Sequence, residues 1–320
     1  MLYIEKNKTK LSRRKDIKSI IQTIIDQRYL YIMSLPLVIW CIIFKYLPIW
    51  GWTMAFQRFQ PGKSFFNQQW VGLANFFELF TDKRFYMVLR NTFAMGILGL
   101  SFGFMASIAF ALLINEIRGT AFKRSIQTIS YLPHFVSWIV VASIVTKLLS
   151  STGIVNMILI NLHVTDKAVQ FTANPDLFWW IVTVSDVWKE MGWNSIIFIS
   201  VVVSINPELY EAAIADGAGR FRRIWHVTLP GIRSTVIIVL MMSIGWLIQI
   251  GFEKQMLLGN PMVKDMSEVL DLYVLKYALK VGRYSFGTAI GVFKSAVSII
   301  LLIFANRLAK AAGEEGIFYK

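Results

Sequence analysis

Long apolar runs dominate the pattern of hydrophobic and polar positions along the chain. Each run is long enough to cross the hydrocarbon core of a bilayer as an α-helix. They are residues 91–115, 125–146 and 234–252, which are uncharged, and 29–57, 177–207 and 284–306, which contain one to three charges. The pattern predicts an all-α membrane protein with six transmembrane helices.

The composition agrees with this prediction. Of the 320 residues, 56% are hydrophobic and 16% are charged, whereas a soluble domain carries about 25% charged residues. The mean hydropathy is +0.55. These values argue against a soluble globular protein and against a disordered one. The single cysteine, Cys41, excludes an intrachain disulfide.

The positive charge indicates how the chain is oriented in the membrane. The net charge is +14. Of the Lys and Arg residues in the segments outside the runs, 18 lie on one predicted side of the membrane and 10 on the other. The richer side comprises 1–28, 115–124, 204–233 and 306–320, and the poorer side comprises 56–90, 151–175 and 259–283. Lys and Arg are retained in the cytoplasm, so we expect both termini there. Much of the excess lies in residues 1–28. The charge reflects topology, and we expect no nucleic-acid partner.

The basic segment 1–28 does not resemble a cleaved signal peptide, because its charged part is long and no small-residue cleavage site follows. Five isoleucines share one face of a predicted helix: Ile17, Ile20, Ile21, Ile24 and Ile25. A helix with this apolar face would either lie on the lipid of the inner leaflet or pack against a partner protein. We therefore divide the chain into a cytoplasmic arm (1–28), a six-helix permease domain (29–306) and a cytoplasmic tail (307–320).

The sequence contains no recognisable motif of a nucleotide-binding, metal-binding or catalytic site. Gly62-Lys63-Ser64 ends like a phosphate-binding loop, but Gln57 stands where the first glycine belongs. The three histidines have no metal-ligand spacing. No serine or cysteine has the setting of a nucleophile. We expect no catalytic residue, no metal and no cofactor in this chain, which would not be an enzyme. If ATP is used, another chain hydrolyses it.

The inner loop 206–230 has the pattern of a helical hairpin. Asn206 is a good N-cap, Pro207 a good first residue, and Gly217 a good left-handed end for the first helix. Gly219 permits a tight restart. We expect a second helix that runs to Leu229 and is ended by Pro230.

This loop resembles the EAA motif of ABC importer permeases. The matching residues are Glu211, Ala212, Ala213, Asp216, Gly217, Gly219, Leu229 and Pro230. The resemblance implies a type I ABC importer permease fold. It also implies that these residues form the coupling helix region that docks in a cleft of the ATPase subunit.

Further segments extend the resemblance over about residues 30–310. The segment that begins at Trp70 resembles the sugar-importer permeases. Those that begin at Asn115, Tyr131, Trp188 and Tyr284 resemble the polysaccharide and complex-oligosaccharide branch of the sugar permeases. The resemblance implies a permease subunit in the cytoplasmic membrane that forms half of a sugar pathway. Its partners would be a second homologous permease, two ATPase subunits that bind ATP and Mg, and an extracellular or periplasmic sugar-binding protein.

Polar and aromatic residues within the apolar runs are candidates for the sugar pathway, because ionisable groups in a membrane usually face a cavity. They are Asp186, Trp188, Lys189, Glu190, Trp193, Trp246, Gln249 and Glu253. Helical spacing places Asp186, Lys189, Glu190 and Trp193 on one face, where Asp186 can pair with Lys189. The same reasoning places Trp246, Gln249 and Glu253 on one face of the fifth span. The alternative is that these groups form ion pairs that only hold the bundle together.

Two other functions remain open from the sequence. A secondary transporter or channel would work without an ATPase, but the sequence has no visible inverted repeat and does have a docking loop. A membrane scaffold would not need polar groups in the fourth and fifth spans.

Overall fold

A computed structural model describes residues 19, 22–311, 313 and 316. The chain divides into two units, Met1–Met54 and Ala55–Lys320.

The first unit is helical throughout its described part. α2 (Arg28–Cys41) continues as a π-helical turn (Ile42–Tyr46) and a 3-10 segment (Leu47–Phe56). Together they form an apolar stretch of 29 residues, as the first run predicts. Ile24 and Ile25 are exposed. Ile17, Ile20 and Ile21 lie outside the described residues, so the amphipathic arm and its boundary stay predictions.

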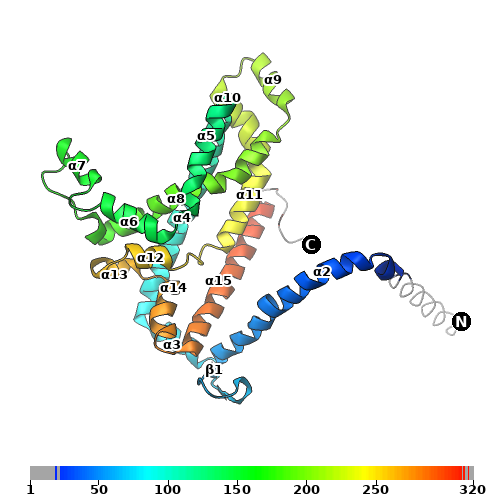
Figure 1. Cartoon of the computed structure of the whole chain (residues 1–320), viewed down its shortest axis with the longest axis vertical. Coiled ribbons are helices and arrows are strands. Elements are labelled where there is room, and N and C mark those ends of the chain that lie inside the picture. Colours follow the sequence, from blue (N-terminus) through cyan, green and yellow to red (C-terminus); the bar gives the residue numbers. More distant parts are fainter. Residues whose placement is uncertain (1–18, 20–21, 312, 314–315, 317–320) are drawn as a thin grey trace. The chain divides into compact units, whose positions relative to one another are not determined.

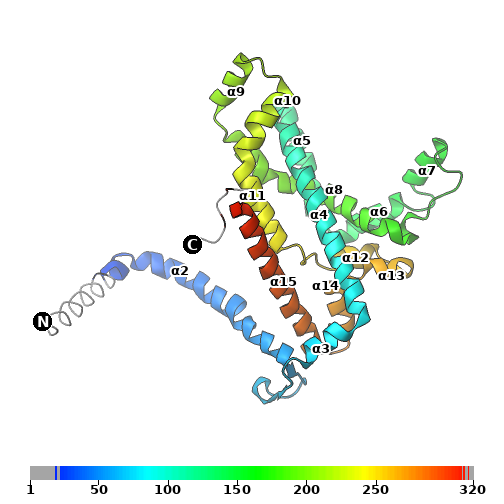
Figure 2. The same ribbon diagram turned by 180° about the vertical axis from the view of Figure 1, so that it is seen from behind.

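The second unit is built on four long helices. They are α4 (Lys83–Asn115), α8 (Pro175–Val203), α11 (Leu229–Gly245) and α15 (Tyr284–Ala311). α4 packs along α8, and α11 packs along α15 (Figures 1 and 2). The side chains of Asp82 and Asn174 cap α4 and α8 by accepting from the backbone N–H groups of Arg84 and Asp176, both at 2.9 Å.

Shorter elements connect these helices. They are β1 (Gln57–Arg58), β2 (Gln69–Trp70), α3 (Ala74–Thr81), α5 (Thr120–Tyr131), α6 (Trp138–Leu148), α7 (Ile154–Asn161), α9 (Pro207–Ala215), α10 (Arg220–Arg223), α12 (Glu253–Leu258), α13 (Lys264–Ser267) and α14 (Leu270–Tyr273). The two strands pair antiparallel, with Gln57 opposite Trp70. In both views α9 lies at one end of this unit and α3 at the other (Figures 1 and 2).

Four helical stretches in the described residues are long and apolar enough to cross a membrane: Arg28–Phe56, Lys83–Asn115, Arg220–Gly245 and Tyr284–Ala311. Two bent pairs raise the number to as many as six: Thr120–Phe135 with Trp138–Leu148, at 102°, and Pro175–Val203 with Pro207–Ala215, at 70°. The prediction of a helical membrane protein is confirmed. Six spans, and termini in the cytoplasm, stay predictions.

The run at 125–146 is not the straight helix that its lack of charge suggests. Residues Leu132–Phe135 form a 3-10 turn, and Val136 is extended. Pro133 has no backbone N–H to donate to the preceding turn, and the chain bends there by 102°.

The predicted end of the inner hairpin at Pro230 is also wrong. The helical stretch runs from Arg220 to Gly245 without a stop. A π-helical turn, Ile224–Thr228, precedes the proline and shifts the hydrogen-bond register. Pro230 then takes a place in the first turn of α11, where its missing N–H is tolerated. The fifth span therefore begins earlier than residue 234 and ends at Gly245 rather than at 252.

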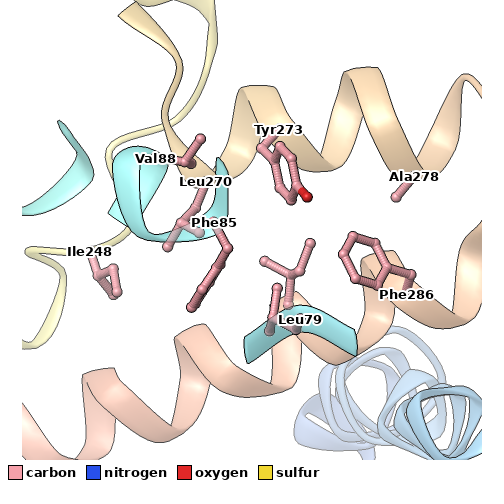
Figure 3. Packing of buried hydrophobic residues seen from close by; sticks show 9 residues of the cluster. Leu79, Phe85, Val88, Ile248, Leu270, Tyr273, Ala278 and Phe286 are labelled. Carbon is pink, nitrogen blue, oxygen red and sulfur yellow. The ribbon is translucent and has the colours of Figure 1, made fainter. Parts of the chain in front are cut away.

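A buried cluster joins α3, α4, α14 and α15. It contains Leu79, Phe85, Val88, Ile248, Leu270, Tyr273, Ala278, Phe286 and Ile290 (Figure 3). Within it, the Tyr273 hydroxyl donates to the carboxylate of Asp82, the residue that caps α4. Burial, and then the hydrogen bond to Asp82, raise the pKa of Tyr273 above its usual range. The cluster anchors the start of α4.

Close backbone contact explains one glycine. A Cβ on Gly192 of α8 would lie 2.0 Å from the carbonyl oxygen of Ser130 in α5. A Cβ on Gly291 of α15 would meet nothing within 4 Å. The two helices α5 and α8 thus touch through a position that admits no side chain.

We therefore expect Gly192→Ala to destabilise the purified protein by roughly 1–3 kcal/mol, because α5 and α8 must separate to admit the methyl group. Gly291→Ala is the matched control, and we expect it to stabilise the protein by about 1 kcal/mol through helix propensity alone. Thermal unfolding in detergent measures both. Equal shifts of the two melting temperatures would contradict the close contact.

Candidate functional site: a polar groove and an exposed inner loop

A groove follows α4, α8 and α11. Two cavities of about 610 and 450 Å³ lie along it. Both are lined by Gly99, Leu100, Asp186, Ile197, Val239 and Ser243. Because the two cavities share these lining residues, they are neighbours, and together they are here called the central groove.

The lining of the central groove combines aromatic and polar side chains. Glu190, Trp193 and Asn194 line the larger cavity, and Trp246 and Lys254 line the smaller one. A sugar presents apolar faces for stacking and a rim of hydroxyls for hydrogen bonds, so such a lining is suited to it. The structure therefore brings together four of the predicted pathway residues, namely Asp186, Glu190, Trp193 and Trp246.

An ion pair lies where the two cavities meet. Lys254 Nζ is 2.8 Å from Asp186 Oδ1, and the two side chains are 16% and 24% exposed. The pair joins α8 to α12. The predicted pairing of Asp186 with Lys189 is wrong, because residues 246–252 bring Lys254 to the carboxylate. Sequence spacing within α8 did not indicate Lys254 as the partner.

Lys189 does not line either cavity and is 4% exposed. Its ammonium donates to the carbonyl oxygen of His134 at 2.5 Å and lies 3.2 Å from Glu190 Oε1. The other oxygen of Glu190 is 2.7 Å from His134 Nδ1. The ring of Trp193 stacks on the imidazole at 4.4 Å and 2°.

This arrangement holds the bend between α5 and α6. A carbonyl released by a broken helix needs a donor where water is scarce, and Lys189 supplies it. For Lys189, the contacts favour the alternative in which the charged groups only hold the bundle together. Glu190 and Trp193 contact the bend and also line the central groove. A direct role for Lys189 in the pathway stays a prediction.

The remaining pathway candidates are more dispersed. Trp188 is 47% exposed and does not line the central groove. Gln249 donates to Ser298 Oγ at 3.4 Å, and Glu253 is exposed at the start of α12. Trp246, Gln249 and Glu253 do not share a helical face, since α11 ends at Gly245. After the helix ends, Ile248 enters the buried cluster.

The inner loop folds locally as its residues predict. The Asn206 side chain accepts from the N–H of Glu208 at 3.0 Å, and α9 begins at Pro207. Gly217 has a φ of 75°, and the N–H of Ala218 donates to the carbonyl of Ala213 at 2.8 Å, which closes the helix. The Tyr210 hydroxyl lies 3.0 Å from Thr228 Oγ1 and ties α9 to the π-helical turn.

The surface of this loop is exposed and partly apolar. Glu211, Ala212, Asp216, Gly217, Gly219 and Pro230 are exposed, and Ala213 and Leu229 are half-buried. Four large apolar side chains nearby are also exposed: Leu209, Ile214, Phe221 and Trp225. Exposed large apolar residues gathered in one loop are typical of an interaction surface. The EAA residues alone did not indicate Phe221, which is 89% exposed, or Trp225, which is 70% exposed.

Beside the loop lies a cavity of about 500 Å³ with both signs of charge. Its lining includes Glu116, Arg118, Glu211 and Arg220. Within the part of the chain that the structure describes, no three or more His, Cys, Asp or Glu residues come close enough to hold a metal ion.

Known proteins resemble this chain over most of its length. The sequence profile of a family described as binding-protein-dependent transport system inner membrane component matches residues 85–313. The polygalacturonan/rhamnogalacturonan transport system permease protein YteP of Bacillus subtilis (strain 168) is 41% identical over 307 residues, which cover 96% of this chain and 95% of that protein. Protein LplB of the same organism is 41% identical over 292 residues, 91% of each chain.

Solved structures agree. A chain in the crystal structure of a bacterial ABC transporter involved in the import of the acidic polysaccharide alginate has a TM-score of 0.82 and 37% sequence identity, covering 92% of this chain and 99% of its own. A chain of bacterial alginate ABC transporter in complex with alginate pentasaccharide-bound periplasmic protein has a TM-score of 0.83 and 36% identity, with the same coverage.

The ion pair at the centre of the groove yields a prediction about stability. We expect Asp186→Asn and Lys254→Met each to lower the melting temperature of the purified protein, because each leaves one largely buried charge without its partner. The double variant should lose less than the sum of the two, with a coupling of about 0.5–3 kcal/mol. Glu116 and Arg220, 3.9 Å apart and more exposed, are the control pair, for which additive effects are expected. Additive losses at Asp186 and Lys254 would contradict the pairing.

Proposed function

The chain belongs to the family of binding-protein-dependent transport system inner membrane components, and we propose that it is one permease subunit of an ATP-driven importer of oligosaccharides. The likeness to an alginate importer over almost the whole chain carries this proposal. The predicted resemblance to the sugar permeases is confirmed, and a secondary transporter or channel that works alone is disfavoured. Polygalacturonan and alginate, which the names of two compared proteins contain, are both chains of sugars.

The proposed assembly has several partners. A second, homologous permease supplies the other half of the pathway, and two ATPase subunits bind ATP and Mg on the cytoplasmic side. A binding protein outside the membrane delivers the sugar, as the periplasmic protein in one compared complex supports. The chain itself is a multi-pass protein of the cytoplasmic membrane. The excess of Lys and Arg supports cytoplasmic positions for both termini and for α9.

The central groove is the proposed share of the pathway in this chain. It opens along α4, α8 and α11, and in the assembly the second permease would cover it. Trp193 and Trp246 would offer faces for stacking, while Asp186, Glu190 and Asn194 would accept or donate hydrogen bonds to hydroxyls. Closure of the ATPase subunits on ATP would turn the helices and expose the groove first to one side of the membrane and then to the other.

The inner loop is the proposed link to the ATPase. α9 is short, capped at its start and exposed, and Glu211 offers an anion beside the small Ala212. A cation or backbone donor in the ATPase cleft would bind that carboxylate. The bond from Tyr210 to Thr228 passes the movement of α9 to the base of α11. Phe221 and Trp225 extend the proposed docking surface.

The function is tested by uptake. In vesicles with the complete transporter, we expect Trp193→Ala and Trp246→Ala to reduce oligosaccharide uptake at least tenfold, since loss of a stacking contact and a wall of the groove is felt at each step of passage. Assembly and basal ATP hydrolysis should persist. Trp188→Ala is the comparison variant: an equal loss of uptake would extend the pathway beyond the central groove. Loss of assembly in the Trp193 and Trp246 variants would assign them to packing instead.

Coupling is tested by substitutions in the loop. Glu211→Lys reverses the proposed docking charge, worth roughly 1.5–3 kcal/mol as a charge-assisted hydrogen bond. Gly217→Val places a side chain at positive φ, at a cost of about 1 kcal/mol or more. We expect both to lower co-purification of the ATPase and sugar-stimulated ATP hydrolysis. Gly62→Val, also at positive φ but far from the loop in sequence, should leave both unchanged. Wild-type coupling in both loop variants would exclude α9 as the link.

A further inference from the structure

The bend between α5 and α6 contains a residue that reaches the central groove only through a neighbour. His134 is half-buried and does not line either cavity of the groove. Its imidazole lies parallel to the indole of Trp193, with 4.4 Å between the ring centroids and 2° between the planes. Trp193 itself lines the larger cavity and is 40% exposed. One face of the indole is therefore covered by His134, and the opposite face is the one that a sugar can reach.

The imidazole is itself held from two sides. Its Nδ1 is 2.7 Å from Glu190 Oε2, and because an ionised carboxylate only accepts hydrogen bonds, Nδ1 carries the hydrogen. The other oxygen of Glu190 is 3.2 Å from Lys189 Nζ, so both carboxylate oxygens have a partner. The ring of Phe135 meets the imidazole edge-on at 5.3 Å and 83°, and it meets the indole edge-on at 5.4 Å and 84°. The two stacked rings therefore have defined orientations.

A stacking surface binds a sugar best when its ring is in place before the sugar arrives. An aromatic side chain that is free to change rotamer loses that freedom on binding, and this loss weakens the complex. The parallel His134 and the perpendicular Phe135 restrict the ring of Trp193, since stacked and edge-on pairs are favoured arrangements of aromatic rings. Without the imidazole, Glu190 keeps Lys189 as a partner, but the covered face of Trp193 loses its contact.

From this geometry we propose that His134 is a positioning residue of the sugar pathway. Its ring supports Trp193 from behind and keeps the free face of the indole turned to the central groove. The proposal rests on the proposed function, in which Trp193 stacks on a passing sugar ring. It assigns the ring contact with Trp193, rather than the hydrogen bond to Glu190, as the contact on which passage of the sugar depends.

Three substitutions separate the two contacts of His134. His134→Phe keeps a ring against Trp193 and removes the donor to Glu190. His134→Asn keeps an amide N–H near the place of Nδ1 and removes the ring, and His134→Ala removes both. We expect uptake to stay within about twofold of wild type in His134→Phe and to fall roughly fivefold to tenfold in the other two variants, as for loss of one aromatic pair.

Uptake is measured in vesicles that contain the complete transporter, supplied with its binding protein loaded with radiolabelled trigalacturonate. The rate is followed against the concentration of loaded binding protein. Because this concentration governs docking outside the membrane, we expect the losses in kcat and an unchanged KM. His163→Asn is the matched control, at an exposed histidine whose φ of 54° asparagine adopts readily, and it should change neither. Assembly and basal ATP hydrolysis should persist in all four variants.

A second measurement reports on the ring of Trp193 and does not depend on the sugar. Complete transporter is produced with 5-fluorotryptophan, and the fluorine resonance of residue 193 is identified by its absence in Trp193→Phe. We expect one sharp line for this residue in the wild type and in His134→Phe. In His134→Asn and His134→Ala the line should broaden or split, because an indole without support exchanges between rotamers.

The opposite order of the variants would overturn the proposal. Near-normal uptake in His134→Asn with a loss in His134→Phe would show that His134 only holds the bend through Glu190. Equal uptake in the three His134 variants, a changed KM with an unchanged kcat, or one sharp line in every variant would also overturn it. Failure of the wild-type transporter to import trigalacturonate or any other oligosaccharide tested would instead contradict the proposed function, and the fluorine lines would still decide whether His134 positions Trp193.

Discussion

The free carbonyl at the bend between α5 and α6 is the constraint around which the second unit is arranged. The helical stretch ends at Phe135 because Val136 is extended, and the carbonyl of His134 is satisfied by the ammonium of Lys189 from α8. Without water, a backbone group of this kind must find a partner in the protein. Lys189, Glu190 and Trp193 of α8 all contact His134 at the bend. Gly192 allows α5 to approach α8 closely enough for these contacts.

A similar logic holds the irregular segment that follows α11. Lys254 pairs with Asp186 of α8, and Asp271 of α14 pairs with Lys294 of α15. Asp271 also accepts from the N–H of Gly251, which has a φ of 72°. Two ion pairs thus secure a stretch of chain that has no helix of its own. The charges inside the bundle are therefore structural.

The central groove has aromatic rings and two carboxylates, so it suits hydroxyl-rich faces of a sugar of any class. The inner loop is remote from the groove along the chain and connects to the bundle through α8 and α11.

The sequence by itself determined the class of the protein, most of its helices and the inner loop. Long uncharged runs have few stable states other than membrane helices. The hairpin depends on residues close in sequence, because Asn206 caps the helix that follows it and Gly217 ends that helix at a positive φ. These features are local, so spacing and residue type predict them.

Only the tertiary structure decided the partners of the charged residues, the passage of the helix through Pro230 and the lining of each cavity. Asp186 pairs with Lys254 rather than with Lys189. The end of α11 at Gly245 brings the distant Lys254 to the carboxylate. Lys189 instead binds the carbonyl of His134 at the bend. Trp246, Gln249 and Glu253 left their expected face because α11 ends at Gly245.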